Sequence, residues 1–119
     1  MKKLIATIVI AATIALAGCK MGSQIYEVAD VSKSEVIILN KKPHQGAIHS
    51  FNISGCGNID GHAEIFLFSN GDIYKSEELK GKIKFKWGGD YYNDKVEIHY
   101  LPNSVTNGCL RLKYKFNDL

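Results

Sequence analysis

The chain has 119 residues, 45% of them hydrophobic, which suffices for one domain with its own core and excludes two. Its 15 basic and 12 acidic residues give a net charge of +3, of which Lys2 and Lys3 at the N-terminus contribute two charges. The rest of the chain therefore carries only +1. That balance lacks the concentrated basic footprint of a nucleic-acid-binding protein, so we expect no nucleic-acid partner.

The N-terminal segment has the organisation of an export signal. Lys2 and Lys3 precede an uncharged apolar run over residues 4–16, which is too short to span a bilayer comfortably. Leu16-Ala17-Gly18-Cys19 follows. This stretch resembles the signal peptide of bacterial lipoprotein precursors, in which the cysteine is acylated, for example with palmitate, and becomes the first mature residue. The alternative is an uncleaved N-terminal helix with Cys19 as an ordinary small residue.

The resemblance covers residues 1–19 only, and it implies a protein anchored to a membrane through the lipid on Cys19. In lipoproteins of Gram-negative bacteria an aspartate after the acylated cysteine retains the protein in the inner membrane. Lys20 stands at that position here. The resemblance therefore implies the outer membrane and a periplasmic environment, with a Gram-positive cell surface as the alternative.

The sequence predicts three regions, namely a signal peptide over residues 1–18, a lipidated N-terminus and tether over 19–34, and a β domain over 35–119. Residues 20–34 are polar and rich in small side chains, as is typical of a flexible linker. A linker of about fifteen residues spans roughly 20 Å, enough to hold a domain clear of a lipid surface. The alternative is that residues 24–28 add an edge strand to the domain.

The first half of the domain alternates short apolar runs with turn residues. Residues 35–39 form a β-branched run, and residues 46–54 alternate in polarity, so both predict strands. The glycine-rich residues 54–61 predict a loop that presents Cys56 at a strand end. Residues 62–68 and 73–76 flank Asn70-Gly71 and predict a β-hairpin.

The second half predicts a turn over residues 77–81 and then three strands over residues 82–87, 95–100 and 110–116. Alternation places Ile83, Phe85, Trp87, Leu110, Leu112, Tyr114 and Phe116 on the core side. We expect these strands to form a meander, because Glu97 would then lie between two lysine-rich strands and relieve their repulsion. The fold class is therefore all-β, an antiparallel β-sandwich or small barrel of about seven or eight strands. No named family is evident for this domain.

Two cysteines remain once Cys19 is acylated. In an exported domain such a pair predicts one disulfide, between Cys56 and Cys109. It would close a loop of just over fifty residues and stabilise the fold by about 4 kcal/mol. The alternatives are two buried thiols or a metal site, but His62 follows Cys56 by six residues and no Cys-x-x-Cys spacing exists.

The sequence contains no nucleophile motif. Gly-x-Ser-x-Gly and His-Glu-x-x-His are absent, and the four histidines, His44, His49, His62 and His99, lie on separate predicted elements. We therefore expect a protein that is not an enzyme and needs no cofactor. Calcium is the alternative, since Asp90, Asn93 and Asp94 supply oxygen donors that Asp60 or Asp72 could join.

Two surfaces are candidate binding sites. One is the loop of Asp90, Tyr91, Tyr92, Asn93 and Asp94, where adjacent tyrosines cannot both point inward and one is expected to be exposed. The other is a basic face, expected to recognise anionic head groups or an acidic partner, formed by Lys82, Lys84, Lys86, Arg111, Lys113 and Lys115. The alternative for the loop is that one tyrosine caps the core and the other pads the loop. For the basic residues it is a solvated sheet surface without a ligand.

These observations favour a small lipid-anchored envelope lipoprotein that acts as a non-catalytic binding or interaction module. Its expected partners are an envelope protein, a glycan or an anionic lipid. The alternative is an accessory enzyme of the envelope, or an inhibitor of one.

Overall fold

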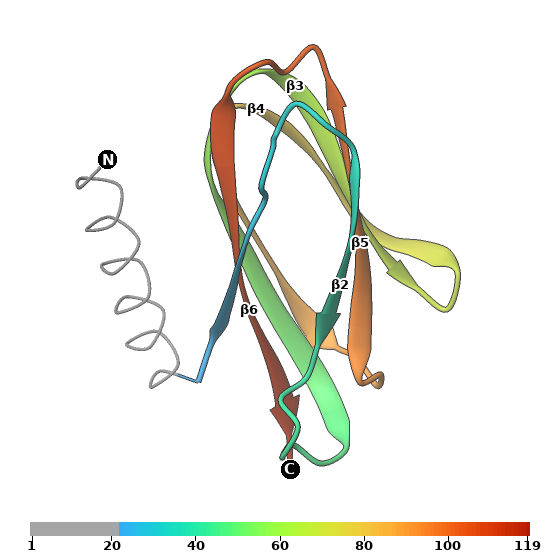
Figure 1. The fold of residues 1–119 in the computed structure, drawn as a ribbon. Helices are drawn as coiled ribbons and strands as arrows, with labels where there is room; N and C mark the ends of the chain where they lie inside the picture. The colour runs from blue at the N-terminus through green and yellow to red at the C-terminus, as the bar shows by residue number, and fades with distance from the viewer. Residues whose placement is uncertain (1–21) are drawn as a thin grey trace, which may run out of the picture.

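The computed structural model describes residues 22–119, and the predicted signal peptide, Cys19 and Lys20 lie outside them. These residues form one antiparallel sheet of six strands (Figure 1). The strands are β1 (Gln24–Glu27), β2 (Glu35–Asn40), β3 (Ile48–Ser69), β4 (Asp72–Asp90), β5 (Lys95–Asn103) and β6 (Gly108–Asp118). The all-β antiparallel class is confirmed, whereas the number of strands differs from the predicted seven or eight. No helix within residues 22–119 has the length and apolar character needed to cross a bilayer.

The sheet is organised around β3, which has different neighbours along its length. Its first part pairs with β6 and its second part with β5, while β4 pairs with both parts along the other edge. β1 adds to β6, and β2 adds to β5. The sheet curls so that these two halves face each other (Figure 1). We call the half with β1, β6 and the start of β3 the first half-sheet, and the half with β2, β5 and the end of β3 the second half-sheet.

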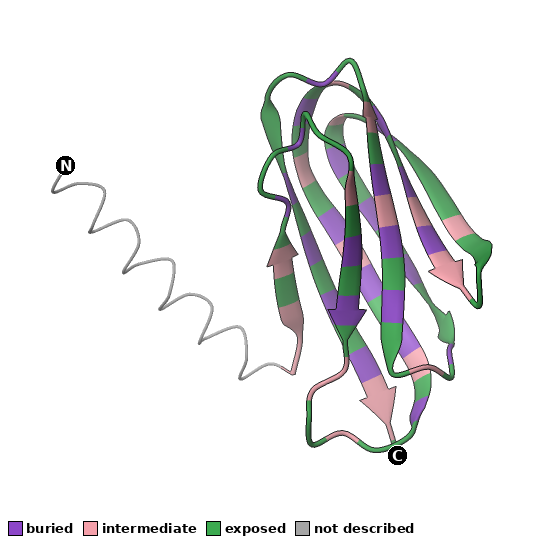
Figure 2. Ribbon diagram, turned by 45° about the vertical axis from the view of Figure 1, so that its right-hand side comes forward, coloured by how far each residue is buried: buried purple, intermediate pink, exposed green. Residues whose placement is uncertain are grey.

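The core fills the space between the half-sheets. Buried and exposed residues alternate along the strands, as expected for strands with one dry and one wet face (Figure 2). Every residue that alternation assigned to the core side of residues 82–87 and 110–116 is buried, which confirms those assignments. Tyr100 and Phe116 are the largest side chains that are fully buried.

The glycine-rich residues 54–61 belong to β3, so the prediction of a loop there is wrong, and the turn predicted over residues 77–81 is likewise part of β4. The two strands bend together, with a register shift between Asn58 and His62 and with Gly81 at a φ of 61°. At Gly55, a Cβ would lie 2.2 Å from the ring of Phe85. The glycines therefore serve close packing inside a bent strand.

The hairpin predicted at Asn70-Gly71 is confirmed. Ser69 pairs with Asp72, and the two residues between them have φ values of 53° and 86°. Two consecutive positive φ angles define the turn that matches the twist of a two-residue hairpin, and asparagine followed by glycine adopts it at the smallest steric cost. This turn joins the two longest strands of the protein.

The predicted meander is wrong. β5 does not lie between β4 and β6, because the first part of β3 occupies that place. Glu97 pairs with Ile38 and Phe68 in the second half-sheet. It therefore cannot neutralise the lysine-rich strands of the first half-sheet, a change that bears directly on the candidate site.

The tether predicted over residues 19–34 is wrong for most of the described part, where the alternative of an edge strand holds. Gln24–Glu27 form β1, and Val28 and Val31 are buried. The Tyr100 hydroxyl donates to the Val31 carbonyl at 2.7 Å. At the edge of the fold, Tyr26 donates to Glu35 on β2, a hydrogen bond that, with burial, raises the pKa of Tyr26 to about 12. Residues 24–31 are thus part of the domain.

Candidate functional site

The six basic residues singled out in the sequence lie together on the outer side of the first half-sheet. All six are exposed, and they form one row on β4 and one row on β6. We call this surface the basic face: Lys82, Lys84, Lys86, Arg111, Lys113 and Lys115. Neighbouring residues of a row are about 7 Å apart, and the rows are about 10 Å apart, from the strand rise and two strand spacings.

Only β3 separates the two rows, and its outward side chains are small and polar. Ser54 pairs with Lys86 on one side and with Lys113 on the other. Cys56 in the same way pairs with Lys84 and with Arg111. Long cationic side chains therefore flank a low central strip on which an anion could rest between them.

Two hollows meet on this strip. One, of about 280 Å³, is lined by Ser54, Lys86, Lys113 and Lys115 among others. The second, of about 600 Å³, shares Ser54 and Lys86 with the first and continues past Cys56 and Lys84. Because both are open to the solvent, the basic face is a shallow trough rather than an enclosed pocket.

The charge of the basic face is almost uncompensated. Among the described residues, its single ion pair joins Arg111 to Glu27 of β1, with Nη2 to Oε2 at 2.6 Å. The hydrogen bond to Glu27 is the main reason that the pKa of Arg111 is raised. None of the five lysines pairs with a described acidic residue. Since Glu97 lies in the other half-sheet, the basic face is more concentrated than the sequence indicated.

The chain enters the domain beside the basic face. Ser23 lines the same hollow as Lys113 and Lys115, and a Cβ at Gly22 would lie 3.6 Å from the Nζ of Lys115. Lys42 donates from Nζ to the Gly22 carbonyl at 3.2 Å. Whatever precedes residue 22 therefore joins the domain at the rim of the basic face.

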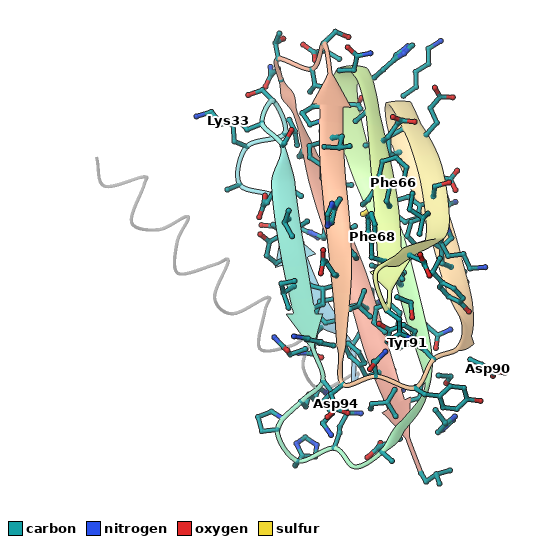
Figure 3. The ribbon with its side chains drawn as sticks, turned by 90° about the vertical axis from the view of Figure 1, so that its right-hand side faces the viewer. Lys33, Phe66, Phe68, Asp90, Tyr91 and Asp94 are labelled. Atoms are coloured by element: carbon teal, nitrogen blue, oxygen red, sulfur yellow. The ribbon has the colours of Figure 1, made fainter. Side chains whose placement is uncertain are left out.

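The loop of Asp90, Tyr91, Tyr92, Asn93 and Asp94 does not form a comparable site. Tyr91 is buried against Phe51, and burial raises its pKa, whereas Tyr92 is 73% exposed, as the prediction of one exposed tyrosine required. Asp94 forms an ion pair with Lys41 at 3.3 Å. Figure 3 shows Asp90 and Asp94 on opposite sides of Tyr91. The nearby hollow of about 230 Å³ is open and includes only Tyr91 and Asn93 of these residues.

Two substitutions distinguish the roles of the paired tyrosines. The Tyr91 hydroxyl donates to the Lys95 carbonyl at 2.7 Å. Tyr91→Phe is therefore expected to lower the free energy of unfolding by about 1 kcal/mol. Tyr92→Phe should leave it within about 0.5 kcal/mol of the unchanged protein. Urea denaturation of both variants measures the difference, and equal stabilities would contradict the assigned roles.

The oxygen donors considered for calcium are spread over the domain. Asp60 accepts hydrogen bonds from the backbone nitrogens of Thr106 and Asn107 at 2.9 and 3.1 Å and from the Thr106 hydroxyl, which hold its pKa below the usual range. The nine residues of β5 separate Asp94 from the turn of Thr106 and Asn107 that binds Asp60, a span of about 30 Å. Within residues 22–119 no three His, Cys, Asp or Glu side chains are grouped as metal ligands.

The structure contains both Cys56 and Cys109 as free, exposed thiols, so the predicted disulfide is not present in it. Neither thiol is buried, and no metal cluster includes them among the described residues. Of the four histidines, His49 and His62 lie on β3, His99 lies on β5 and His44 lies between β2 and β3. His99 contacts Glu97 at 2.6 Å.

Two features of the surface were not predicted from the sequence. Ser54 was not singled out, because only strand pairing places it between two cationic rows. The outer side of the second half-sheet is partly apolar. The rings of Phe68 and His99 are tilted against each other with centroids 4.3 Å apart, beside Phe66 (Figure 3). Val36 and Ile38 of β2 are exposed on the same side. The alternation of polarity does not indicate this surface, because both sides of these strands carry apolar residues.

No family model matches the chain, and no curated protein matches it in sequence. Among solved structures, PirA is 10% identical, with 81% of this chain and 94% of that chain covered at a TM-score of 0.49. The Yersinia pseudotuberculosis-derived mitogen is 11% identical, with 82% and 86% covered at 0.45. The carbohydrate-binding module CBM36, in complex with calcium and xylotriose, is 14% identical, with 76% and 78% covered at 0.38. At these values we draw no functional conclusion from the likeness.

Proposed function

We propose that the chain is a lipid-anchored, non-catalytic binding module of the bacterial cell envelope that binds anionic lipid head groups through its basic face. The observation that carries this proposal is the pairing of β3 with β4 and β6. It sets two rows of cations on either side of Ser54 with Glu27 as the only ion-pair partner among the described residues. Such an array attracts anions, and each Lys or Arg near an anionic surface contributes about 1 kcal/mol.

The shape of the basic face favours a lipid surface over a glycan. Its hollows are shallow and open, and the cations stand about 7 Å apart within a row and about 10 Å apart between the rows. A membrane offers head-group charges in a plane, whereas a glycan that binds tightly calls for a deeper groove with directed hydrogen bonds.

The point at which the chain enters the domain supports the same partner. Gly22 lies against Lys115, and Cys19 precedes Gly22 by three residues. If Cys19 is acylated, as its resemblance to lipoproteins implies, the basic face lies within reach of the bilayer that holds the acyl chains. A lipid anchor and a basic patch reinforce each other, since stable attachment commonly needs two such signals. We place the protein at the outer membrane, which Lys20 supports.

The test reverses one lysine in each row of the basic face. A chain that begins at Lys20 is compared with its Lys84→Glu, Lys113→Glu variant for sedimentation with vesicles that contain phosphatidylglycerol. We expect the reversal to weaken binding by about 30-fold or more, because each reversal replaces an attraction with a repulsion. Binding should also fall between about 0.1 M and 1 M salt, where the Debye length shortens from about 10 Å to 3 Å.

The matched control is Lys33→Glu, Lys95→Glu, which changes the charge equally at exposed lysines outside the basic face. Lys33 lies on the turn before β2 (Figure 3), and neither Lys33 nor Lys95 belongs to a row of the basic face. Equal binding by the two double variants would refute the assignment to the basic face. Binding to phosphatidylcholine vesicles with equal affinity, or binding only to an acidic polysaccharide, would refute the lipid partner.

A further inference from the structure

The two cysteines lie next to each other on the outer side of the first half-sheet. Cys56 of β3 pairs with Arg111 of β6, and Cys109 of β6 pairs with Asn58 of β3. Side chains two residues apart on a strand point to the same face, so Cys109 shares the face of Arg111 and of Cys56. The thiols are therefore diagonal neighbours on adjacent antiparallel strands, with Cα atoms about 7–8 Å apart. A disulfide usually spans about 4.4–6.8 Å between Cα atoms, so a strand shift of about 1 Å brings the sulfurs within bonding distance.

The Arg111 side chain turns away from Cys56. Arg111 pairs with Cys56 and directs its guanidinium to Glu27 on β1. Its Nε and Nη2 lie 2.9 and 2.6 Å from Oε2 of Glu27. β1 lies on the far side of β6 from Cys56.

The backbones approach closely at this place. A Cβ at Gly57 would lie 2.1 Å from the carbonyl oxygen of Cys109, and a Cβ at Gly108 would lie 2.1 Å from that of Asn58. The glycines next to each cysteine thus allow the two strands to pack without intervening side chains. Cys56 also lines the hollow of about 600 Å³, so a small reagent has access to its sulfur.

We infer that Cys56 and Cys109 form a reversible disulfide across the outer side of the first half-sheet, next to Arg111 in the basic face. Both thiols are free in the structure. The disulfide would fix β6, and through pairing also β1, to β3. It would thereby hold the Arg111 row at a constant distance from the Lys84 row. Because both thiols are exposed, a reductant can reach the bond, and exposed disulfides are the ones that are readily reduced.

The oxidant is a small-molecule disulfide such as oxidised glutathione. One protein thiolate attacks a sulfur of that disulfide, which forms a mixed disulfide and releases one thiol. The second protein thiolate then attacks the protein sulfur of the mixed disulfide and releases the second thiol. Two protein thiols are oxidised, and one small disulfide is reduced to two thiols.

The experiment uses the full chain, expressed with its own N-terminal segment and purified in detergent. It is equilibrated with oxidised glutathione, quenched in acid and alkylated, and its peptides are measured by mass spectrometry. We expect a linked pair of peptides containing Cys56 and Cys109, which dithiothreitol separates. The oxidised protein should melt about 5 °C or more above the reduced protein.

Cys56→Ser and Cys109→Ser serve as matched controls, since each keeps one exposed thiol in the same surroundings. Neither should show the linked peptides or the rise in melting temperature on oxidation. Alkylation of both cysteines without reductant, after the oxidant, would overturn the inference. So would a disulfide found only between two chains, seen as a doubled mass without reductant. Neither outcome depends on lipid binding, so the inference and the proposed function can fail separately.

Discussion

A chain that begins at residue 35 is expected to melt about 15 °C or more below one that begins at residue 22, or to show no cooperative transition. It would lack β1 and the buried side chains of Val28 and Val31. Burying a valine contributes about 1.5 to 3 kcal/mol, and the lost hydrogen bond from Tyr100 to Val31 adds about 1 kcal/mol. That sum is a large part of the 5 to 15 kcal/mol typical of a domain.

The measurement is thermal unfolding followed by circular dichroism for both chains. Loss of β1 would also expose the edge of β6, so the shorter chain is expected to aggregate more readily. Val28→Ala with Val31→Ala in the longer chain is a milder control, and it should lie between the two. Equal melting temperatures for the two chains would show that residues 22–34 are only a tether.

Gly57→Ala is expected to lower the free energy of unfolding by about 3 kcal/mol or more. The added Cβ would lie 2.1 Å from the carbonyl oxygen of Cys109, and that oxygen belongs to the backbone of a paired strand. Gly57 also has a φ of 150°, which side chains rarely adopt. Because neither the oxygen nor the strand can move aside cheaply, the pairing of β3 with β6 has to distort.

Gly46→Ala is the matched control for this substitution. Gly46 is exposed, and a Cβ there would meet only Asp118 Oδ2, at 3.8 Å. Its effect should stay within about 0.5 kcal/mol. Urea denaturation of both variants gives the comparison, and similar midpoints would contradict the close approach of β3 and β6.

Several local features were predictable from the sequence because they depend on neighbouring residues. Asn70-Gly71 specified its hairpin, since the turn requires two consecutive positive φ angles that these residues adopt readily. Alternation placed Ile83, Phe85 and Trp87 in the core and Lys82, Lys84 and Lys86 outside. The candidate basic residues were therefore assigned to the correct side of their strands before their strand neighbours were known.

The glycine-rich stretch shows where local interpretation fails. Three glycines within residues 55–61 indicated a loop, because glycine weakens a strand by its own preference. In the structure the strand continues, since Phe85 fills the space above Gly55 and the Cys109 carbonyl approaches Gly57. These contacts come from residues about thirty and fifty positions away in the chain. A sequence pattern cannot indicate them.

The sequence by itself determined that the domain consists of strands, which residues face its core, and that six cations share one side of two strands. The tertiary structure alone decided what lies between those cations. The first part of β3 places Ser54 and Cys56 between the rows. The second part of β3 pairs with β5, so Glu97 lies in the second half-sheet. The physical reason is that side-chain direction follows from a two-residue repeat along one strand, whereas strand order depends on where distant segments bend and pair.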